Sequence, residues 1–323
     1  MIDEVLAQPD QLADALWRVQ AADVPRRDLP GGLLVCGMGG SAIGGDLAVA
    51  AIGARAARPV RTVRGYSPEP WLTPETLVLC ASYSGHTEET LACFEAAGEA
   101  GAHRVVITTG GPLAARAREE EVPVIGVPSG MQPRAAVVYM TVGALECAAL
   151  CGAAPSLRDE IEGAAPVLEG VGSAGESERI AEVLRDTLPV VHGAEATAAP
   201  ARRWKTQLNE NAKVAAFASE LPEANHNEIE AWRWAHDHAP IAAVFLTAAG
   251  LHPRATRRLE LTAGLIEGQG LPVIRVAASG ESAVARVLSL VMLGDLVSVR
   301  LAQLGGIDPE PVIYIEGFKD ALG

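Results

Sequence analysis

The sequence predicts an α/β protein built from two doubly wound parallel sheets in tandem. Short apolar runs alternate with segments of helical periodicity along almost the whole chain, which is the pattern of strands joined by crossover helices. Aromatic residues make up only 4% of the chain, which favours helices packed closely on a parallel sheet over an aromatic-rich sandwich. Because 323 residues are long for a single core, we expect two domains, residues 1–153 and 154–323.

The first domain is expected to open with a helix over residues 3–20, where apolar side chains recur at helical spacing. The apolar segment 135–154 has the composition of a membrane span, but Glu146 near its middle indicates a helix buried between the sheet and a partner. Strands are predicted at 32–37, 59–64, 76–81, 104–109 and 122–127, and the helices between them at 37–52, 88–101 and 113–118.

The second domain is expected to follow a joint between residues 152 and 187, where Gly170-Val-Gly-Ser-Ala-Gly175 predicts a turn. The order of strands and helices then repeats that of the first domain, although no residue-level repeat is visible. Strands are predicted at 188–192, 214–218, 241–247 and 271–277, and helices at 196–213, 253–267, 281–304 and 311–322.

Charge and cysteine content exclude several classes of protein. A net charge of −14 argues against a nucleic-acid surface, because such a surface needs clustered Lys and Arg. The five cysteines are odd in number and form no C-x-x-C pair, which is typical of reduced thiols. The N-terminus is acidic, whereas a secretory signal begins with basic residues. We therefore expect a cytoplasmic protein that binds neither nucleic acid nor a membrane.

The segment Cys80-Ala-Ser-Tyr-Ser-Gly-His-Thr-Glu-Glu-Thr90 gives the strongest indication of a binding site. A predicted strand ends there, a tight loop follows, and a helix begins. Ser82, Ser84 and Thr87 supply hydroxyl donors, and Gly85 lets the backbone turn inward. Together with the unpaired amides at the helix start, these groups would hold a phosphate monoester. The simpler interpretation is an ordinary helix cap, since Ser and Thr before Glu-Glu are common there.

A second glycine-rich loop, Gly37-Met-Gly-Gly-Ser-Ala-Ile-Gly-Gly-Asp46, follows the first predicted strand. It satisfies the permissive dinucleotide fingerprint G-x-G-x-x-G/A. However, the second strand ends at Arg64 and lacks the acidic residue that receives the ribose hydroxyls, so NAD is not expected and only NADP remains as an alternative. We instead expect Gly39, Gly40 and Ser41 to form a second wall of a sugar phosphate pocket.

Two polar residues of the second domain are unusual for their surroundings. Glu210 lies near the end of a predicted helix that must pack on the sheet, and His226 stands between Asn225 and Asn227, at the start of another predicted helix. A carboxylate and an imidazole near a phosphate pocket are the groups that move protons on a sugar. The alternative is that Glu210 is a surface residue and that His226 merely neighbours a helix cap.

Six segments occur in one order from about residue 31 to the C-terminus: Gly37-Met-Gly-Gly-Ser, Ser82-Tyr-Ser-Gly-His-Thr-Glu-Glu-Thr, Gln132-Pro-Arg-Ala-Ala, Leu208-Asn-Glu-Asn, Asn225-His-Asn-Glu-Ile, and Asp308-Pro through Phe318-Lys319. This combination resembles the bifunctional phosphoglucose/phosphomannose isomerases, which consist of two flavodoxin-like sugar isomerase (SIS) domains. The two loops alone indicate an SIS domain. Asn225-His-Asn and the lysine near the C-terminus narrow the resemblance to this branch.

The resemblance implies a role for each matching residue. Glu210 matches the base that moves a proton between C2 and C1 of the open-chain sugar. His226 matches the ring-opening histidine, which the neighbouring subunit of a homodimer supplies. Arg134 matches an arginine that would stabilise enediolate charge, and Lys319 matches a lysine that lines the same site. The residues that match the substrate- and phosphate-binding loops are Gly39, Gly40, Ser41, Ser82, Ser84 and Thr87.

The resemblance also implies an activity, namely interconversion of fructose 6-phosphate with glucose 6-phosphate and mannose 6-phosphate through a cis-enediol. One carboxylate suffices for this reaction, and no metal or cofactor is required, because nearby cations can stabilise the developing charge. His86 stands where the family usually has Asn, and Gln132 replaces a common proline, so the preferred sugar stays open. A sensor that binds a sugar phosphate without turnover is the alternative, because it needs the phosphate loop but not Glu210 or His226.

Overall fold

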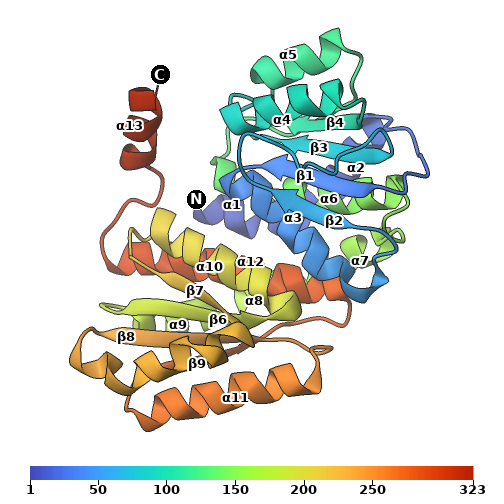
Figure 1. Ribbon diagram of the computed structural model, residues 1–323. Helices are drawn as coiled ribbons and strands as arrows, with labels where there is room; N and C mark the ends of the chain where they lie inside the picture. Colours follow the sequence, from blue (N-terminus) through green and yellow to red (C-terminus); the bar gives the residue numbers. More distant parts are fainter. Residues whose placement is uncertain (323) are drawn as a thin grey trace. The chain divides into compact units, whose positions relative to one another are not determined.

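The computed structural model describes residues 1–322 and divides into two compact units. The first unit contains Leu6–Glu169 and Gly280–Val287, and the second contains Met1–Val5, Gly170–Ser279 and the chain from Leu288 onward. Each unit is a parallel sheet covered by helices, as expected (Figure 1). The predicted domain boundary between residues 153 and 154 stays a prediction. In the structure, the residues up to Glu169 cluster with the first unit.

The sheet of the first unit has five parallel strands in the order β2-β1-β3-β4-β5. The central strands β1 and β3 are buried along their whole length, as continuous apolar runs predict for a sheet covered on both faces. Their register aligns Gly37 with Ala81, so the loops that follow these strands begin side by side. The strands are β1 (Gly32–Gly37), β2 (Val60–Val63), β3 (Thr76–Ala81), β4 (His103–Thr108) and β5 (Val124–Gly126).

Helices cover both faces of this sheet. On one face α4 and α5 contribute Phe94 and Leu113 to a core with the sheet residues Leu34 and Val78. Elsewhere α3 packs against α6. At that contact a Cβ on Gly44 would lie 2.5 Å from the Met140 Cβ, so glycine permits the close approach. The helices are α2 (Gln8–Ala21), α3 (Gly39–Ile52), α4 (Glu88–Glu99), α5 (Gly111–Glu119), α6 (Val137–Leu150), α7 (Arg158–Glu162) and α8 (Ala165–Ser173), with 3-10 turns η1 (Gly53–Arg55) and η2 (Pro133–Ala136).

The second unit has four parallel strands in the order β7-β6-β8-β9. Figure 1 shows α10 and α12 on one face of the sheet and α11 on the other. Each face has its own apolar core. The strands are β6 (Leu188–Ala194), β7 (Phe217–Leu221), β8 (Ile241–Thr247) and β9 (Val273–Ala277). The helices are α1 (Ile2–Leu6), α9 (Glu176–Leu184), α10 (Ala198–Glu210), α11 (Pro253–Gly268), α12 (Ala283–Leu304) and α13 (Ile313–Leu322), with η3 (Glu195–Thr197), η4 (Glu223–His226) and η5 (Glu228–Asp237).

Among the predicted helices and turns, three differ clearly in the structure. The helix over 3–20 is divided into α1 and α2, because Pro9 lies in the first turn of α2 and has no N–H to continue a helix through that point. The turn predicted at 170–175 is wrong for its first four residues, which are helical in α8. The bend is confined to Ala174 and Gly175, and Gly175 has a φ of 66°. The helix expected after His226 is instead the 3-10 helix η5.

Within residues 1–322, two helices are long and apolar enough to cross a membrane, Pro133–Leu150 and Ala283–Leu304. In both, 83% of the tested window is buried inside the protein, which is typical of a core helix. The helix that contains Glu146 is therefore buried, as the sequence predicts. Burial also raises the pKa of the Glu146 carboxyl group, despite the neighbouring Arg158 and Arg26.

Candidate functional site

The two predicted substrate loops are joined by a direct hydrogen bond in the first unit. Gly39 begins α3, two residues after β1, and has a φ of 50° that suits glycine. Ser41 follows in the first turn of α3 and is almost fully buried. Its hydroxyl oxygen accepts a hydrogen bond of 3.2 Å from the backbone N–H of Tyr83, which lies in the loop after β3. The structure thus brings the glycine-serine loop and the hydroxyl loop together at the ends of neighbouring strands.

The hydroxyl groups of the second loop form a compact cluster. Ser82 is buried, and its Oγ lies 2.8 Å from the Thr87 hydroxyl and accepts from the backbone N–H of Gly85 at 3.1 Å. Ser84 is exposed, and its Oγ accepts from the N–H of His86 at 3.2 Å. Ser82 therefore fixes the loop from inside, whereas Ser84 and Thr87 remain accessible to a ligand.

Thr87 occupies the N-cap position of α4, but its side chain makes no capping hydrogen bond. Its hydroxyl contacts Ser82 instead, and the first amides of α4 have no partners within the helix. The simple explanation of the loop as a helix cap therefore does not describe Thr87. Backbone N–H groups at a helix start, together with the positive end of the helix dipole, are a favourable environment for a phosphate group.

Gly85 is required by the shape of this loop. Its φ is 71°, and a Cβ at this position would lie 2.0 Å from the carbonyl oxygen of Gly110. Any other residue would have to displace the neighbouring backbone, because the contact is with a main-chain atom. The close approach of the two segments holds the hydroxyl loop against the start of α5.

Arg134 lies beside the first glycine loop. It is 3% exposed, and its guanidinium donates a 3.2 Å hydrogen bond to the side-chain oxygen of Gln132. A Cβ on Gly40 would lie 3.2 Å from the Arg134 Cα, so α3 and the segment η2 are in close contact there. Gln132, which departs from the family pattern, thus has a defined structural partner in this chain.

The second unit carries Glu210 at the last position of α10. The same helix buries Trp204 and Leu208 in the core, so its end is firmly placed on the sheet. The Glu210 side chain is half-buried, and its backbone carbonyl accepts a hydrogen bond from the Lys213 ammonium. A half-buried carboxylate at the end of an anchored helix is a suitable group for proton transfer.

His226 is exposed between two asparagines that are both tied to their surroundings. Asn225 donates to the Thr262 hydroxyl at 2.8 Å, and Asn227 donates to Glu223 at 2.9 Å. The imidazole of His226 has no hydrogen-bond partner among residues 1–322. Its neighbours therefore hold the short segment in place while the ring itself faces outward from its unit.

Lys319 lies on α13 and is exposed. Within the first unit the structure brings together seven predicted residues: Gly39, Gly40, Ser41, Ser82, Ser84, Thr87 and Arg134. Glu210, His226 and Lys319 belong to the second unit. The roles of all ten residues stay predictions.

The sequence reasoning missed Tyr83, whose backbone links the two loops and whose hydroxyl donates to the Pro128 carbonyl at 3.1 Å. The only signal was its place between two serines. Arg64, considered for an NADP phosphate, forms an ion pair of 2.6 Å with Asp46, which weakens that alternative. Within residues 1–322 no group of three or more His, Cys, Asp or Glu side chains is arranged to hold a metal ion.

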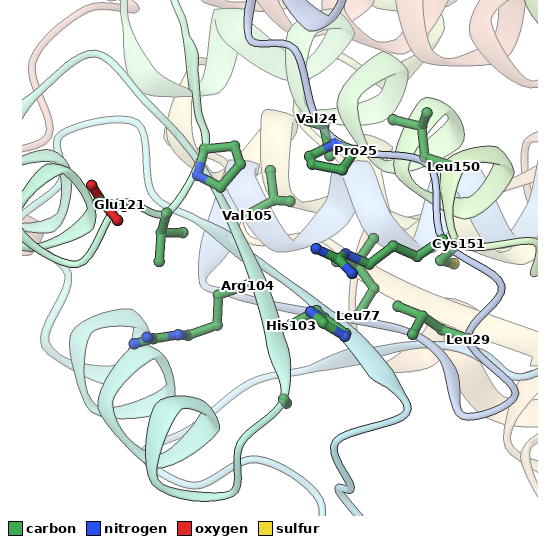
Figure 2. A pocket seen from close by; sticks show the side chains of 14 residues that line it. Val24, Pro25, Leu29, Leu77, His103, Arg104, Val105, Glu121, Leu150 and Cys151 are labelled. Carbon is green, nitrogen blue, oxygen red and sulfur yellow. The ribbon is translucent and has the colours of Figure 1, made fainter.

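A pocket of about 280 Å³ in the first unit lies away from these loops. It is lined by residues at the start of β3 and β4, such as Leu77 and His103, whereas the predicted loops follow the other ends of strands in the same sheet. Figure 2 shows the His103 ring and the Arg104 side chain on opposite sides of β4. None of the predicted site residues lines this pocket.

Comparison with known proteins identifies relatives along the whole chain. A family model described as the bacterial phospho-glucose isomerase C-terminal SIS domain matches residues 173–322. A bifunctional phosphoglucose/phosphomannose isomerase from Aquifex aeolicus is 38% identical over 293 residues, which are 90% of this chain and 90% of that protein. A protein of the same description from Caldicellulosiruptor bescii is 34% identical over 335 residues, covering 100% of this chain and 98% of its own.

Solved structures agree on the fold. A hypothetical protein from Thermus thermophilus superimposes with a TM-score of 0.79 at 18% identity, covering 99% of this chain and 89% of that chain. At this level of identity the likeness concerns the fold alone. It extends over nearly the full chain, so both parallel sheets are included.

Proposed function

The chain belongs to the bifunctional phosphoglucose/phosphomannose isomerases, and from this premise we propose that it interconverts fructose 6-phosphate with glucose 6-phosphate and mannose 6-phosphate. The observation that carries the proposal is the loop from Ser82 to Thr87, in which hydroxyl groups surround the uncapped start of α4. Such a loop suits a phosphate ester, which both hexose classes share.

Phosphate binding is assigned to Ser84, Thr87 and the first amides of α4, with Ser82 supporting them from inside. Gly39, Gly40 and Ser41 flank the sugar, because their backbone lies next to the hydroxyl loop. The absence of side chains on the two glycines would let main-chain groups approach the ligand closely.

Proton transfer is assigned to Glu210. Removing a proton from carbon beside a carbonyl builds negative charge on oxygen, so the enediolate needs a nearby cation. Arg134 and Lys319 are the cations assigned to this role. In this scheme Glu210 takes the proton from C2 or C1 and returns it to the other carbon on the same face, while His226 moves a proton during ring opening.

We further propose a cytoplasmic homodimer in which His226 completes the site of the neighbouring subunit. Its ring is exposed and has no hydrogen-bond partner among residues 1–322, so it is available to a second chain. A second supporting feature is α13, on which Ile313, Tyr314 and Phe318 are 73%, 94% and 67% exposed. These side chains leave roughly 400 Å² of surface open, about half of one partner's share of a standard interface.

The direct test is a coupled assay of the purified protein with fructose 6-phosphate and mannose 6-phosphate. Turnover by the parent protein is expected, together with a loss of at least about a hundredfold in kcat for Glu210→Gln while fructose 6-phosphate still binds. Thr206→Val is the control, because this side chain lies on the same helix and its one hydrogen bond among the described residues goes to the carbonyl of Arg203. Binding without turnover by the parent protein would instead support a sugar phosphate sensor.

The dimer arrangement is tested by mixing two inactive variants, Glu210→Gln and His226→Ala, under conditions in which subunits exchange. If His226 acts across the dimer, each mixed dimer contains one intact site, and activity should return to about a quarter of the parent value. If His226 acts within its own subunit, no mixture restores activity.

A further inference from the structure

A chain of buried polar contacts runs from the interior of the second unit to the residue next to Glu210. Its first link joins α10 to α12 through an ion pair. The Arg203 guanidinium donates from Nε to Asp295 Oδ1 and from Nη2 to Asp295 Oδ2, each at 2.9 Å. Both side chains are only 1% exposed. This pair therefore has a two-pronged geometry and is removed from water.

Stability alone does not explain such a pair. Taking two charges out of water is costly, and replacing a buried ion pair by apolar side chains is often neutral or favourable. What the pair provides is a defined geometry, because a guanidinium and a carboxylate bound through two parallel hydrogen bonds fit in one way. The contact fixes the rotation and register of α10 on α12, in addition to the apolar contacts that Trp204 makes there.

The second link continues from Asp295 along α12. The Ser298 hydroxyl donates to the Asp295 carbonyl at 2.7 Å and accepts from Asn211 Nδ2 at 2.8 Å. Asn211 and Ser298 are both 0% exposed. Asn211 also reaches the side-chain oxygen of Gln207 at 3.3 Å, one turn earlier on α10. Asn211 directly follows Glu210, so its buried carboxamide fixes the backbone from which the Glu210 side chain extends.

We propose that Asn211 and Ser298 are positioning residues for Glu210, with the Arg203–Asp295 pair setting the register of the helix that carries it. The inference rests on the proposed function, in which Glu210 is the base. Proton transfer needs the carboxylate within hydrogen-bond reach of the reacting carbon. A displacement of about 1 Å in such a group can cost on the order of a hundredfold in rate. The contact between Asn211 and Ser298 prevents this displacement.

The test uses Asn211→Ala and, as a milder change, Ser298→Ala in the full-length protein. We expect kcat to fall about ten- to a hundredfold for Asn211→Ala and several-fold for Ser298→Ala. KM for fructose 6-phosphate should change less than about twofold, because the phosphate loop is untouched. Leu259→Ala serves as the control for general destabilisation, since Leu259 is fully buried against the other face of the same sheet. It should retain kcat at temperatures where it is folded.

A double variant distinguishes positioning from loss of structure. If Asn211 acts only through the Glu210 carboxylate, Asn211→Ala should add no further loss to Glu210→Gln, and the two effects will not multiply. Independent multiplication of the effects, or a parent-like kcat in both single variants, would overturn the inference. These outcomes differ from failure of the proposed function, which would appear as a parent protein without turnover or as full activity in Glu210→Gln.

Discussion

His192 should make the second unit sensitive to acid. It lies on the central strand β6, is 0% exposed, and has no hydrogen-bond partner at either ring nitrogen among the described residues. Its ring stacks on Phe245 with centroids 4.5 Å apart and contacts Trp232 at 5.7 Å. With aromatic rings rather than carboxylates against it, the charged form has no compensation, and burial lowers the pKa of His192 to about 4.

The size of the effect follows from the two pKa values. An unfolded histidine titrates near pH 6.5, so the unfolded chain takes up a proton first as the pH falls. Stability is therefore lost between about pH 6.5 and pH 4, and is fully present above that range. A pKa of about 4 in the folded state corresponds to a loss of roughly 3 kcal/mol in the free energy of unfolding. Within this range the free energy of unfolding falls by up to about 1.4 kcal/mol per pH unit.

The variant His192→Leu removes the titrating group and keeps an apolar side chain in the core. The free energy of opening β6 and β8 is measured by amide hydrogen exchange at several pH values, corrected for the intrinsic exchange rate. Between pH 7 and pH 4, we expect the free energy of opening to fall by roughly 3 kcal/mol more in the parent protein than in the variant. This comparison holds for any difference in stability between the two proteins at pH 7. Parallel pH profiles would refute the reasoning, as would an imidazole resonance of His192 that titrates near 6.5.

Three further predictions concern the structural framework, each measured by urea unfolding. Gly85→Ala should cost more than about 2 kcal/mol because of its positive φ and the backbone contact, whereas Gly53→Ala, with a positive φ but open space, should cost about 1 kcal/mol. Glu146→Gln should stabilise the protein at pH 7 to 8. Burial raises the pKa of Glu146, so the free energy of unfolding of the parent protein falls as the pH rises above the ordinary pKa of a carboxyl group, and the uncharged amide avoids this loss. Equal or lower stability of the variant would contradict this. Asp295→Ala should cost about 3 to 5 kcal/mol, because it removes the carboxylate that Arg203 contacts in the core. Replacing both residues by Leu and Met should cost far less, and similar losses in the two variants would show that packing rather than charge dominates.

The strands with continuous apolar runs were predictable from the sequence. Those over 32–37, 76–81 and 241–247 match β1, β3 and β8 to the residue, because each is buried and bounded by turn-forming residues. The strand expected at 214–218 was wrong by three residues, since β7 runs from Phe217 to Leu221. It is an edge strand with mostly exposed side chains, so its position is fixed by pairing with β6 rather than by an apolar pattern.

The candidate site was predictable where local chemistry defines it. Hydroxyls and glycines that follow an apolar run mark a loop at the end of a strand, and the loops after β1 and β3 are found there. The contacts that hold the site together were not predictable. Ser41 meets Tyr83 across 42 residues, and Arg203 meets Asp295 across 92 residues, so both depend on the packing of helices that only the folded chain determines.

The two units share the order of four parallel strands, yet among the described residues only the first unit has a hydroxyl-rich loop after its central strand. In the first unit β3 is followed by Ser82-Tyr-Ser-Gly-His-Thr, whereas the equivalent strand β8 is followed by Ala248-Ala-Gly-Leu-His252, which offers no cluster of hydroxyls. The strand β6 is likewise followed by the 3-10 turn η3 (Glu195–Thr197) rather than by a glycine loop like the one after β1. Because these four strands have the same order in both sheets, the difference lies in the loops and not in the order of the strands. The residue that we propose as the base, Glu210, accordingly lies at the end of α10 rather than in a loop after a strand, next to the buried Asn211.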